Sequence, residues 1–348
     1  MPSKPEFSFT LPKELIANLM KGCLTYEPIP DVPFNPQKGH DYNPHVAAWA
    51  INAIIVAYRQ FCDKTKGDLL PENVTADATT LYWHEELNIL EDKARCGYIG
   101  KINPIKDDPT NRIVIAFRGT EKLNEWLENL DYSQTDVSFN NIPDTVTIHK
   151  GFWDLVSKPA TSHILSYIEK VSLFFIKYFT QKKPTLTSEI PSLLDQLTLL
   201  IPKYLSKTAP NEIYIAGHSL GAATATLVTL ESILNFPKAK IITYVIGCPR
   251  VGGPSLSELF KDLSENSDYN FTLWRLTNTE DIVTTVPLPV IHDLTYSQLF
   301  LSRPGSPNTV GSIPFSDNLS NVAHNHNPLL YSYANKQLMS SKPEDTTK

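Results

Sequence analysis

The chain has 348 residues, of which 41% are hydrophobic and 20% are charged, a composition typical of a globular protein. Its formal net charge of −6 argues against a broad nucleic-acid-binding surface and against strong attraction to anionic lipid. A chain of this length buries a large core, and α/β folds of this size often form a single domain.

The N-terminal part, 1–44, is rich in proline and short polar turns, and we expect it to form an extension that wraps the core. No positively charged start followed by an apolar run is present, so no secretory signal is expected. The longest apolar stretch, 46–61, contains Asn52, Arg59 and Gln60 and falls short of the roughly 20 apolar residues that cross a bilayer. These features predict a cytoplasmic protein or one that is exported without a leader.

The cysteines form no CxxC pair, so the sequence indicates neither a disulfide framework nor a zinc site. We expect each cysteine to be a small buried side chain. The four positions are Cys23, Cys62, Cys96 and Cys248.

In chain order, the first long predicted helix covers 45–61, where apolar residues recur at helical spacing. Short runs rich in β-branched and aromatic residues then predict strands at 97–102, 112–117, 145–148, 212–216, 241–246 and 271–276. Segments of helical length lie between the later strands, at 152–182, 220–234 and 255–263. This alternation predicts an α/β fold with a mostly parallel central sheet covered by helices on both faces.

We expect one domain over 45–335, with a helical insert near 155–205 that is unusually apolar. The tail at 336–348 is expected to be disordered.

The segment Gly217-His218-Ser219-Leu220-Gly221 lies between a predicted strand and a predicted helix. A serine at so sharp a turn projects its hydroxyl, and the flanking glycines remove β-carbons that would clash. The N–H of Leu220 then lies at a helix start, where unpaired donors favour an anion. A glycine turn with a capping serine is the structural alternative. The context favours a nucleophile, Ser219, with the N–H of Leu220 as half of an oxyanion hole.

A serine hydroxyl needs a histidine base, and that histidine needs an acid to orient it. In strand–turn–helix hydrolases the chain order is serine, acid, histidine. Asp281 follows the predicted strand 271–276 and is our choice of acid, with its neighbour Glu280 as the alternative. Spacing alone leaves the histidine open among His292, His324 and His326.

The second oxyanion donor is expected in a loop after an earlier buried strand, at Arg118-Gly119-Thr120. Thr120 offers both its N–H and its hydroxyl, whereas Arg118 is expected to pair structurally. Removing one such donor typically lowers kcat about 100- to 1000-fold, so a working site needs it.

Together these segments resemble the class 3 lipases, the family of the fungal triacylglycerol lipases and many bacterial relatives. Five segments carry the likeness, in family order: 117–120 with Trp126 after it, 149–152, 217–221, 247–252 and 281–287. The likeness extends over about 45–335 and implies an α/β-hydrolase fold in a bacterial-type member.

The resemblance implies a catalytic triad of Ser219, Asp281 and His326. The family's histidine often precedes a tyrosine by five positions, and His326 with Tyr331 fits that spacing. The resemblance also places the oxyanion donors at Thr120 and Leu220. Two other histidines, at positions 149 and 218, are family features that are read as structural.

The resemblance further implies a helical lid directly after Thr120. One apolar face is present there, formed by Leu123, Trp126, Leu127 and Leu130. A plain surface helix packed on the core is the alternative.

The apolar insert departs from the compact family pattern. It either walls an acyl-chain pocket, docks on a membrane surface or, as the simplest interpretation, elongates a helix that covers the sheet.

We therefore expect a carboxylic-ester hydrolase, and within that class a lipase that acts on acylglycerols through an acyl-enzyme. A phospholipase A1, an esterase for short or aromatic acyl groups and, from another class, a non-catalytic lipid-binding scaffold are the alternatives. The partners implied are a lipid or small ester substrate and transient contact with a lipid interface. No nucleic acid, protein partner, metal or organic cofactor is implied.

Overall fold

The computed structural model describes residues 33–36, 39, 42–62, 70–71, 73–75, 77–83, 95–120, 131, 133–159, 191–277, 281–286, 326–329, 331–332 and 335. Most of the predicted N-terminal extension lies outside these residues, as do the predicted lid at 121–130, the middle of the insert at 160–190 and the predicted tail.

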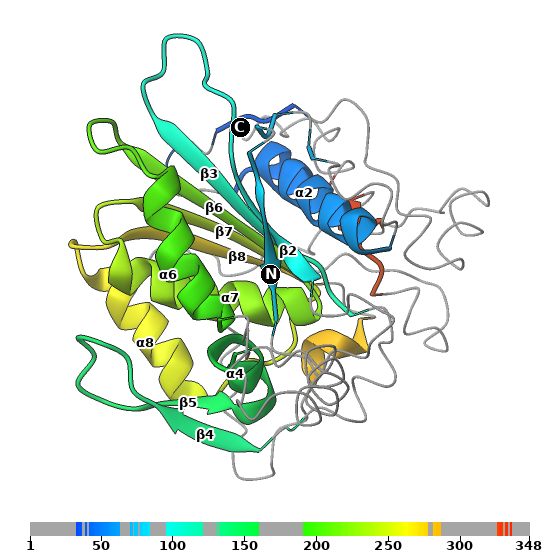
Figure 1. The fold of residues 1–348 in the computed structure, drawn as a ribbon. Helices are drawn as coiled ribbons and strands as arrows, with labels where there is room; N and C mark the ends of the chain where they lie inside the picture. The colour runs from blue at the N-terminus through cyan, green and yellow to red at the C-terminus, as the bar shows by residue number, and fades with distance from the viewer. Residues whose placement is uncertain are drawn as a thin grey trace, which may run out of the picture.

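A six-stranded sheet forms the framework, in the order β1-β2-β3-β6-β7-β8 (Figure 1). The strands β3, β6, β7 and β8 run parallel, whereas β1-β2 and β2-β3 are antiparallel pairs. The prediction of a mostly parallel sheet of the α/β-hydrolase type is therefore confirmed. The strands are β1 (Thr79–Tyr82), β2 (Arg95–Lys101), β3 (Asn111–Phe117), β6 (Asn211–His218), β7 (Lys240–Ile246) and β8 (Asn270–Leu276).

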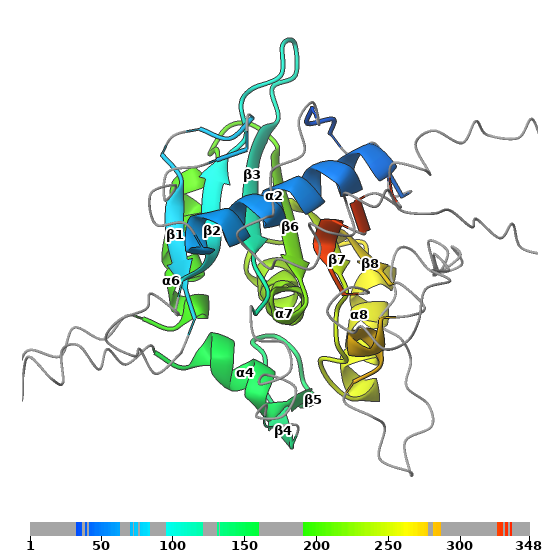
Figure 2. The same ribbon diagram turned by 90° about the vertical axis from the view of Figure 1, so that its right-hand side faces the viewer.

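Helices cover both faces of this sheet, as Figure 2 shows from the side of α2. The helix α2 (Pro44–Cys62) crosses one face and contacts β2, β3, β6 and β7. The opposite face carries α6 (Leu193–Tyr204), α7 (Leu220–Asn235) and α8 (Pro254–Glu265).

Alternation along each strand divides the core into two layers. In β3, Ile113, Ile115 and Phe117 pack in the layer of α6, α7 and α8, while Val114 and Ala116 pack in the layer of α2. Because both faces are buried, the parallel strands are near-continuous apolar runs. This is why each of them was predicted within one or two residues of its ends.

Two strands lie where none was predicted. The edge strand β1 has four residues, and β4 (Gln134–Val137) exposes two of its four residues. A polar strand of this kind lacks the apolar alternation that identifies strands in a sequence. The strand β4 pairs with β5 (Val146–His149) in a separate two-stranded ribbon, so the predicted strand at 145–148 lies outside the central sheet.

The predicted helix at 152–182 is interrupted after residue 157, and its part at 160–182 lies outside the described residues. The helix α4 (Lys150–Ser157) ends there, and Lys158 has an extended backbone with φ −94° and ψ 144°. Pro159 explains the end, because the residue before a proline disfavours helical backbone.

The prediction for the cysteines is wrong at one position. Cys96 and Cys248 are buried free thiols, as expected, but Cys62 at the end of α2 is disulfide-bonded. No helix in the described part of the chain is both long and apolar enough to cross a membrane.

Candidate active site

Ser219 occupies the turn between the end of β6 and the start of α7. Its backbone has φ 58° and ψ −126°, in a region that favours glycine. The flanking glycines make this turn possible. A β-carbon at Gly217 would lie 2.1 Å from the carbonyl oxygen of Gly221, and one at Gly221 would lie 2.2 Å from that of Arg118. The Oγ of Ser219 is buried and has no hydrogen-bond partner among the described residues.

The segment Arg118-Gly119-Thr120 runs directly against this turn. It follows β3, whose last residue is paired with Gly217 in parallel register. A β-carbon at Gly119 would lie 2.7 Å from Cβ of Ser219, so the two main chains are in contact there. Leu220 is the first residue of α7, where an N–H has no acceptor within the helix. The structure therefore brings both predicted oxyanion donors, Thr120 and Leu220, to the turn that holds Ser219.

Arg118 is held within the protein by contacts of its own. Its Nε donates to the carbonyl oxygen of Arg95 at 2.7 Å, and a terminal nitrogen donates to that of Gly119 at 2.7 Å. Its guanidinium lies 3.5 Å from the centroid of the Phe61 ring. These contacts fix the loop that carries Thr120.

Asp281 and His326 meet although 45 positions separate them. Nδ1 of His326 lies 2.7 Å from Oδ2 of Asp281. Because a carboxylate accepts the Nδ1 proton, the neutral ring leaves Nε2 unprotonated, and that atom is buried with no hydrogen-bond partner among the described residues. Asp281 is fully buried, and two more donors hold it: the hydroxyl of Tyr331 at 2.7 Å and the N–H of Val283 at 3.0 Å.

Gly247, which follows β7, leaves room for this pair. Its φ is 57°, and a β-carbon there would lie 2.9 Å from Cε1 of His326 and 3.1 Å from Oδ2 of Asp281. Its N–H donates to the carbonyl oxygen of Leu276 at 3.0 Å, which ties the ends of β7 and β8 together.

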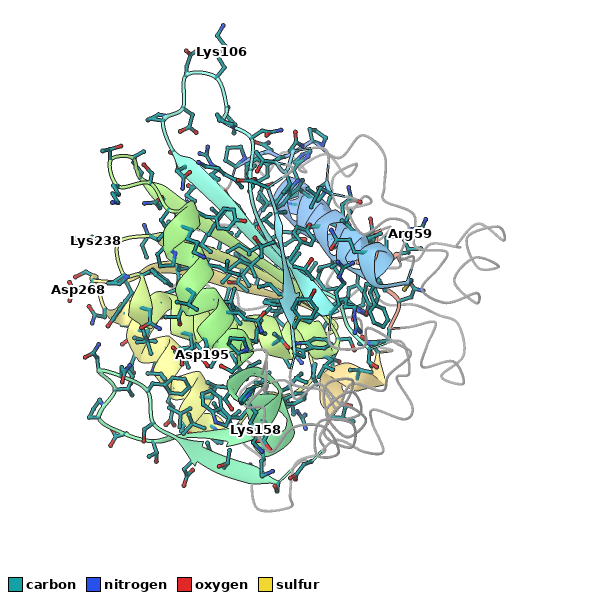
Figure 3. All side chains as sticks on the ribbon, viewed as in Figure 1. Arg59, Lys106, Lys158, Asp195, Lys238 and Asp268 are labelled. Carbon is teal, nitrogen blue, oxygen red and sulfur yellow. The ribbon has the colours of Figure 1, made fainter. Side chains whose placement is uncertain are left out.

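Thr120, Ser219 and Asp281 follow β3, β6 and β8, at the carboxyl edge of the parallel strands where sites in α/β folds collect. Figure 3 shows the opposite edge, where Lys238 and Asp268 mark the loops that lead into β7 and β8. Arg59 on α2 lies on the other side of the molecule.

Some predicted alternatives remain outside this geometry. Glu280, His292 and His324 lie outside the described residues, as do the lid residues Leu123, Trp126, Leu127 and Leu130.

Sequence reasoning used Tyr331 only as a spacing marker and missed its contact with Asp281. It also missed Tyr58 of α2, whose hydroxyl lies 2.9 Å from Nδ1 of His218. The helical pattern around Tyr58 indicated only a core residue.

A family model described as "Lipase (class 3)" matches residues 114–291, slightly more than half of the chain. The chain belongs to the class 3 lipase family. The matched range includes Thr120, Ser219 and Asp281 and ends before His326.

Among curated relatives, the chain is 27% identical over 226 residues to "Phospholipase A(1) DAD1, chloroplastic" of Arabidopsis thaliana, covering 62% of this chain and 40% of that protein. It is 27% identical over 197 residues to "Triacylglycerol lipase OBL1" of the same plant, covering 52% of this chain and 35% of that protein. The chain thus spans well under half the length of these relatives. They are plant proteins, and they give no support to the expectation of a bacterial-type member.

Among solved structures, M37 lipase aligns with a TM-score of 0.48 at 15% identity, covering 87% of this chain and 96% of that one. Lip2 lipase from Yarrowia lipolytica aligns with a TM-score of 0.42 at 17% identity, covering 73% of this chain and 77% of that one. These likenesses are too distant to support an argument about function.

Proposed function

We propose that this class 3 lipase is a serine hydrolase that cleaves carboxylic esters, with acylglycerols as its substrates. One observation carries the proposal. Oγ of Ser219 and Nε2 of His326 are both buried without a hydrogen-bond partner among the described residues, while Nδ1 of the same histidine is bound by Asp281. Buried polar atoms are ordinarily hydrogen-bonded, so two unpaired ones at the carboxyl edge of the sheet favour atoms reserved for a reaction.

The proposed mechanism has two halves. Nε2 of His326 accepts the proton of Ser219 as Oγ attacks the ester carbonyl, and Asp281 stabilises the imidazolium that forms. The oxyanion accepts hydrogen bonds from Thr120 and from the N–H of Leu220. The alcohol leaves with the proton from His326. A water molecule then gives a proton to the same histidine and attacks the acyl carbon. The bond from that carbon to Oγ breaks, Oγ takes the proton back from His326, and the acid is released.

The lipid character of the substrate rests on the family, on the predicted lid, which lies outside the described residues, and on the insert, whose middle at 160–190 does so too. We propose that Leu123, Trp126, Leu127 and Leu130 form the apolar face of a lid that meets a lipid interface. The insert near 155–205 is proposed to belong to the same single domain, 45–335, and to contribute apolar surface close to the site.

Covalent labelling tests the nucleophile. We expect a fluorophosphonate probe to modify Ser219 alone, and Ser219→Ala to lose both labelling and hydrolysis of a p-nitrophenyl ester. Modification at another residue, or equal rates in the two proteins, would overturn the assignment. Equal rates would leave the non-catalytic lipid-binding scaffold as the better interpretation.

A series of substrates tests the substrate class. We expect emulsified long-chain acylglycerols to be hydrolysed faster than short-chain esters in solution. Faster release of the sn-1 acyl chain from phosphatidylcholine would favour a phospholipase A1, which the name of one relative describes. Strong preference for acetyl or butyryl esters, with no activity on emulsions, would favour an esterase.

A further inference from the structure

His218 precedes the proposed nucleophile, yet its side chain has no part in the mechanism above. The ring is 2% exposed, and both of its nitrogens lie within hydrogen-bond distance of a partner. One partner belongs to His326, the proposed base, and the other is Tyr58 on α2. The ring therefore joins three elements that are far apart in the sequence.

The two contacts define which nitrogen of His218 carries the proton. Nε2 lies 2.6 Å from the carbonyl oxygen of His326, and since a carbonyl oxygen only accepts, Nε2 is the donor. Nδ1 lies 2.9 Å from the hydroxyl of Tyr58, which in the neutral ring must donate to it. Burial, and then the neighbouring His326, hold the pKa of His218 well below its usual value, so the ring is neutral.

Two described side chains thus hold His326 from opposite ends. Asp281 binds Nδ1 of its ring, and His218 binds its main-chain carbonyl. The His218 ring also lies against the His326 ring, with centroids 4.6 Å apart and planes tilted by 35°. Asp281 orients the imidazole ring of His326, whereas His218 holds the main chain that carries this ring.

We propose that Tyr58 and His218 act as a positioning pair for His326. Tyr58 donates to Nδ1 of His218 and holds the ring in the orientation in which its Nε2 proton reaches the carbonyl oxygen of His326. That proton holds the main chain of His326 so that its own Nε2 faces Ser219. The inference rests on the proposed function, because it takes His326 as the base.

Loss of the Tyr58 hydroxyl has a defined consequence. Nδ1 of His218 is then left buried without a donor, and the ring is no longer held in its orientation. A ring that turns draws its Nε2 proton away from the carbonyl oxygen of His326 and releases the main chain there. A misplacement of about 1 Å in a catalytic group lowers a rate by up to about 100-fold, and one neutral hydrogen bond corresponds to about 10-fold.

The test compares kcat and KM for a soluble p-nitrophenyl ester in four variants. We expect Tyr58→Phe to lower kcat about 10-fold with KM unchanged. Tyr98→Phe is the matched control, because it removes another buried hydroxyl that bonds α2, at 3.2 Å from the carbonyl oxygen of Ala53. His218→Gln keeps an amide donor near Nε2 and is expected to retain more activity than His218→Asn, whose amide lies near Nδ1.

Nitrogen-15 NMR of labelled histidine supplies a readout that does not depend on activity. We expect the proton of His218 on Nε2 in the unmodified protein, and in Tyr58→Phe the same tautomer with an Nδ1 resonance shifted by the loss of its donor. A proton on Nδ1 in the unmodified protein would overturn the positioning pair whatever the activity. Equal kcat in Tyr58→Phe and Tyr98→Phe would also overturn it while leaving the proposed function in place. If the unmodified protein hydrolyses no ester and its Ser219 resists labelling, the proposed function itself is wrong.

Discussion

The hydroxyl of Tyr331 donates to Oδ2 of Asp281 at 2.7 Å, the same oxygen that accepts from His326. This second donor limits the positions that the buried carboxylate can take. In Tyr331→Phe the carboxylate keeps His326 but loses that restraint, and we expect kcat for a soluble ester to fall about 10-fold. Steady-state kinetics check this, and an unchanged kcat would show that Val283 and His326 suffice to fix Asp281.

Gly247→Ala is expected to displace the His326 ring. The new methyl group would lie 2.9 Å from Cε1 of that ring, and φ 57° is unfavourable for alanine. Displacement by about 1 Å predicts a loss of up to about 100-fold in kcat. Gly253→Ala is the matched control, because the nearest atom to its β-carbon is 3.4 Å away, at ordinary contact distance. Similar activity in both variants would argue against a tight fit around His326.

Substitutions at Thr120 test separately the hydroxyl and the N–H that this residue is proposed to donate to the oxyanion. Thr120→Val keeps the shape and the N–H but removes the hydroxyl, and we expect a loss of about 100- to 1000-fold in kcat with a small change in KM. Thr120→Ser keeps the hydroxyl and is expected to stay within a few-fold of the unmodified protein. If valine is tolerated as well as serine, only the N–H of Thr120 acts on the oxyanion.

The loop between β2 and β3 gives a pH-dependent prediction remote from the site. Hydrogen bonds from Thr110, and then from Arg112, lower the pKa of Asp108 from 3.8 to about 2. Because the pKa is lower in the folded state, this stabilisation is present above about pH 4 and is lost as the pH falls toward 2. Asp108→Asn should therefore lose less stability than the unmodified protein between pH 4 and pH 2. Thermal midpoints across that range measure the effect.

Asp107→Asn is the control for that experiment, since it removes one carboxylate from the same loop. A pH dependence as steep in Asp108→Asn as in the unmodified protein would show that other groups govern acid unfolding.

The sequence was informative where burial imposes a pattern. Strands covered on both faces are apolar throughout, which located the strands leading to Thr120, Ser219 and Asp281. The short β1 and the polar β4 carry no such pattern. Pro159 was a local signal for the end of α4 that the apolar periodicity after it concealed.

The parts of the site that depend on tertiary contact had no local signal. His326 could be chosen among three histidines only from the family spacing. The sequence between Asp281 and His326 carries no pattern that indicates which histidine returns to the sheet. The contact between Tyr58 and His218 joins positions 160 apart. A tyrosine near the end of an apolar helix is as well explained by the core as by a hydrogen bond to the residue beside the proposed nucleophile.

The left-handed backbone of Ser219 opposes thermal stability to its proposed catalytic role. A side chain held at φ 58° costs on the order of 1–3 kcal/mol relative to glycine. Ser219→Gly should therefore melt at a higher temperature than the active protein while hydrolysing no ester. Selection of variants for thermal stability alone would therefore favour loss of the proposed nucleophile. A directed-evolution experiment on this chain needs a selection for ester hydrolysis in every round.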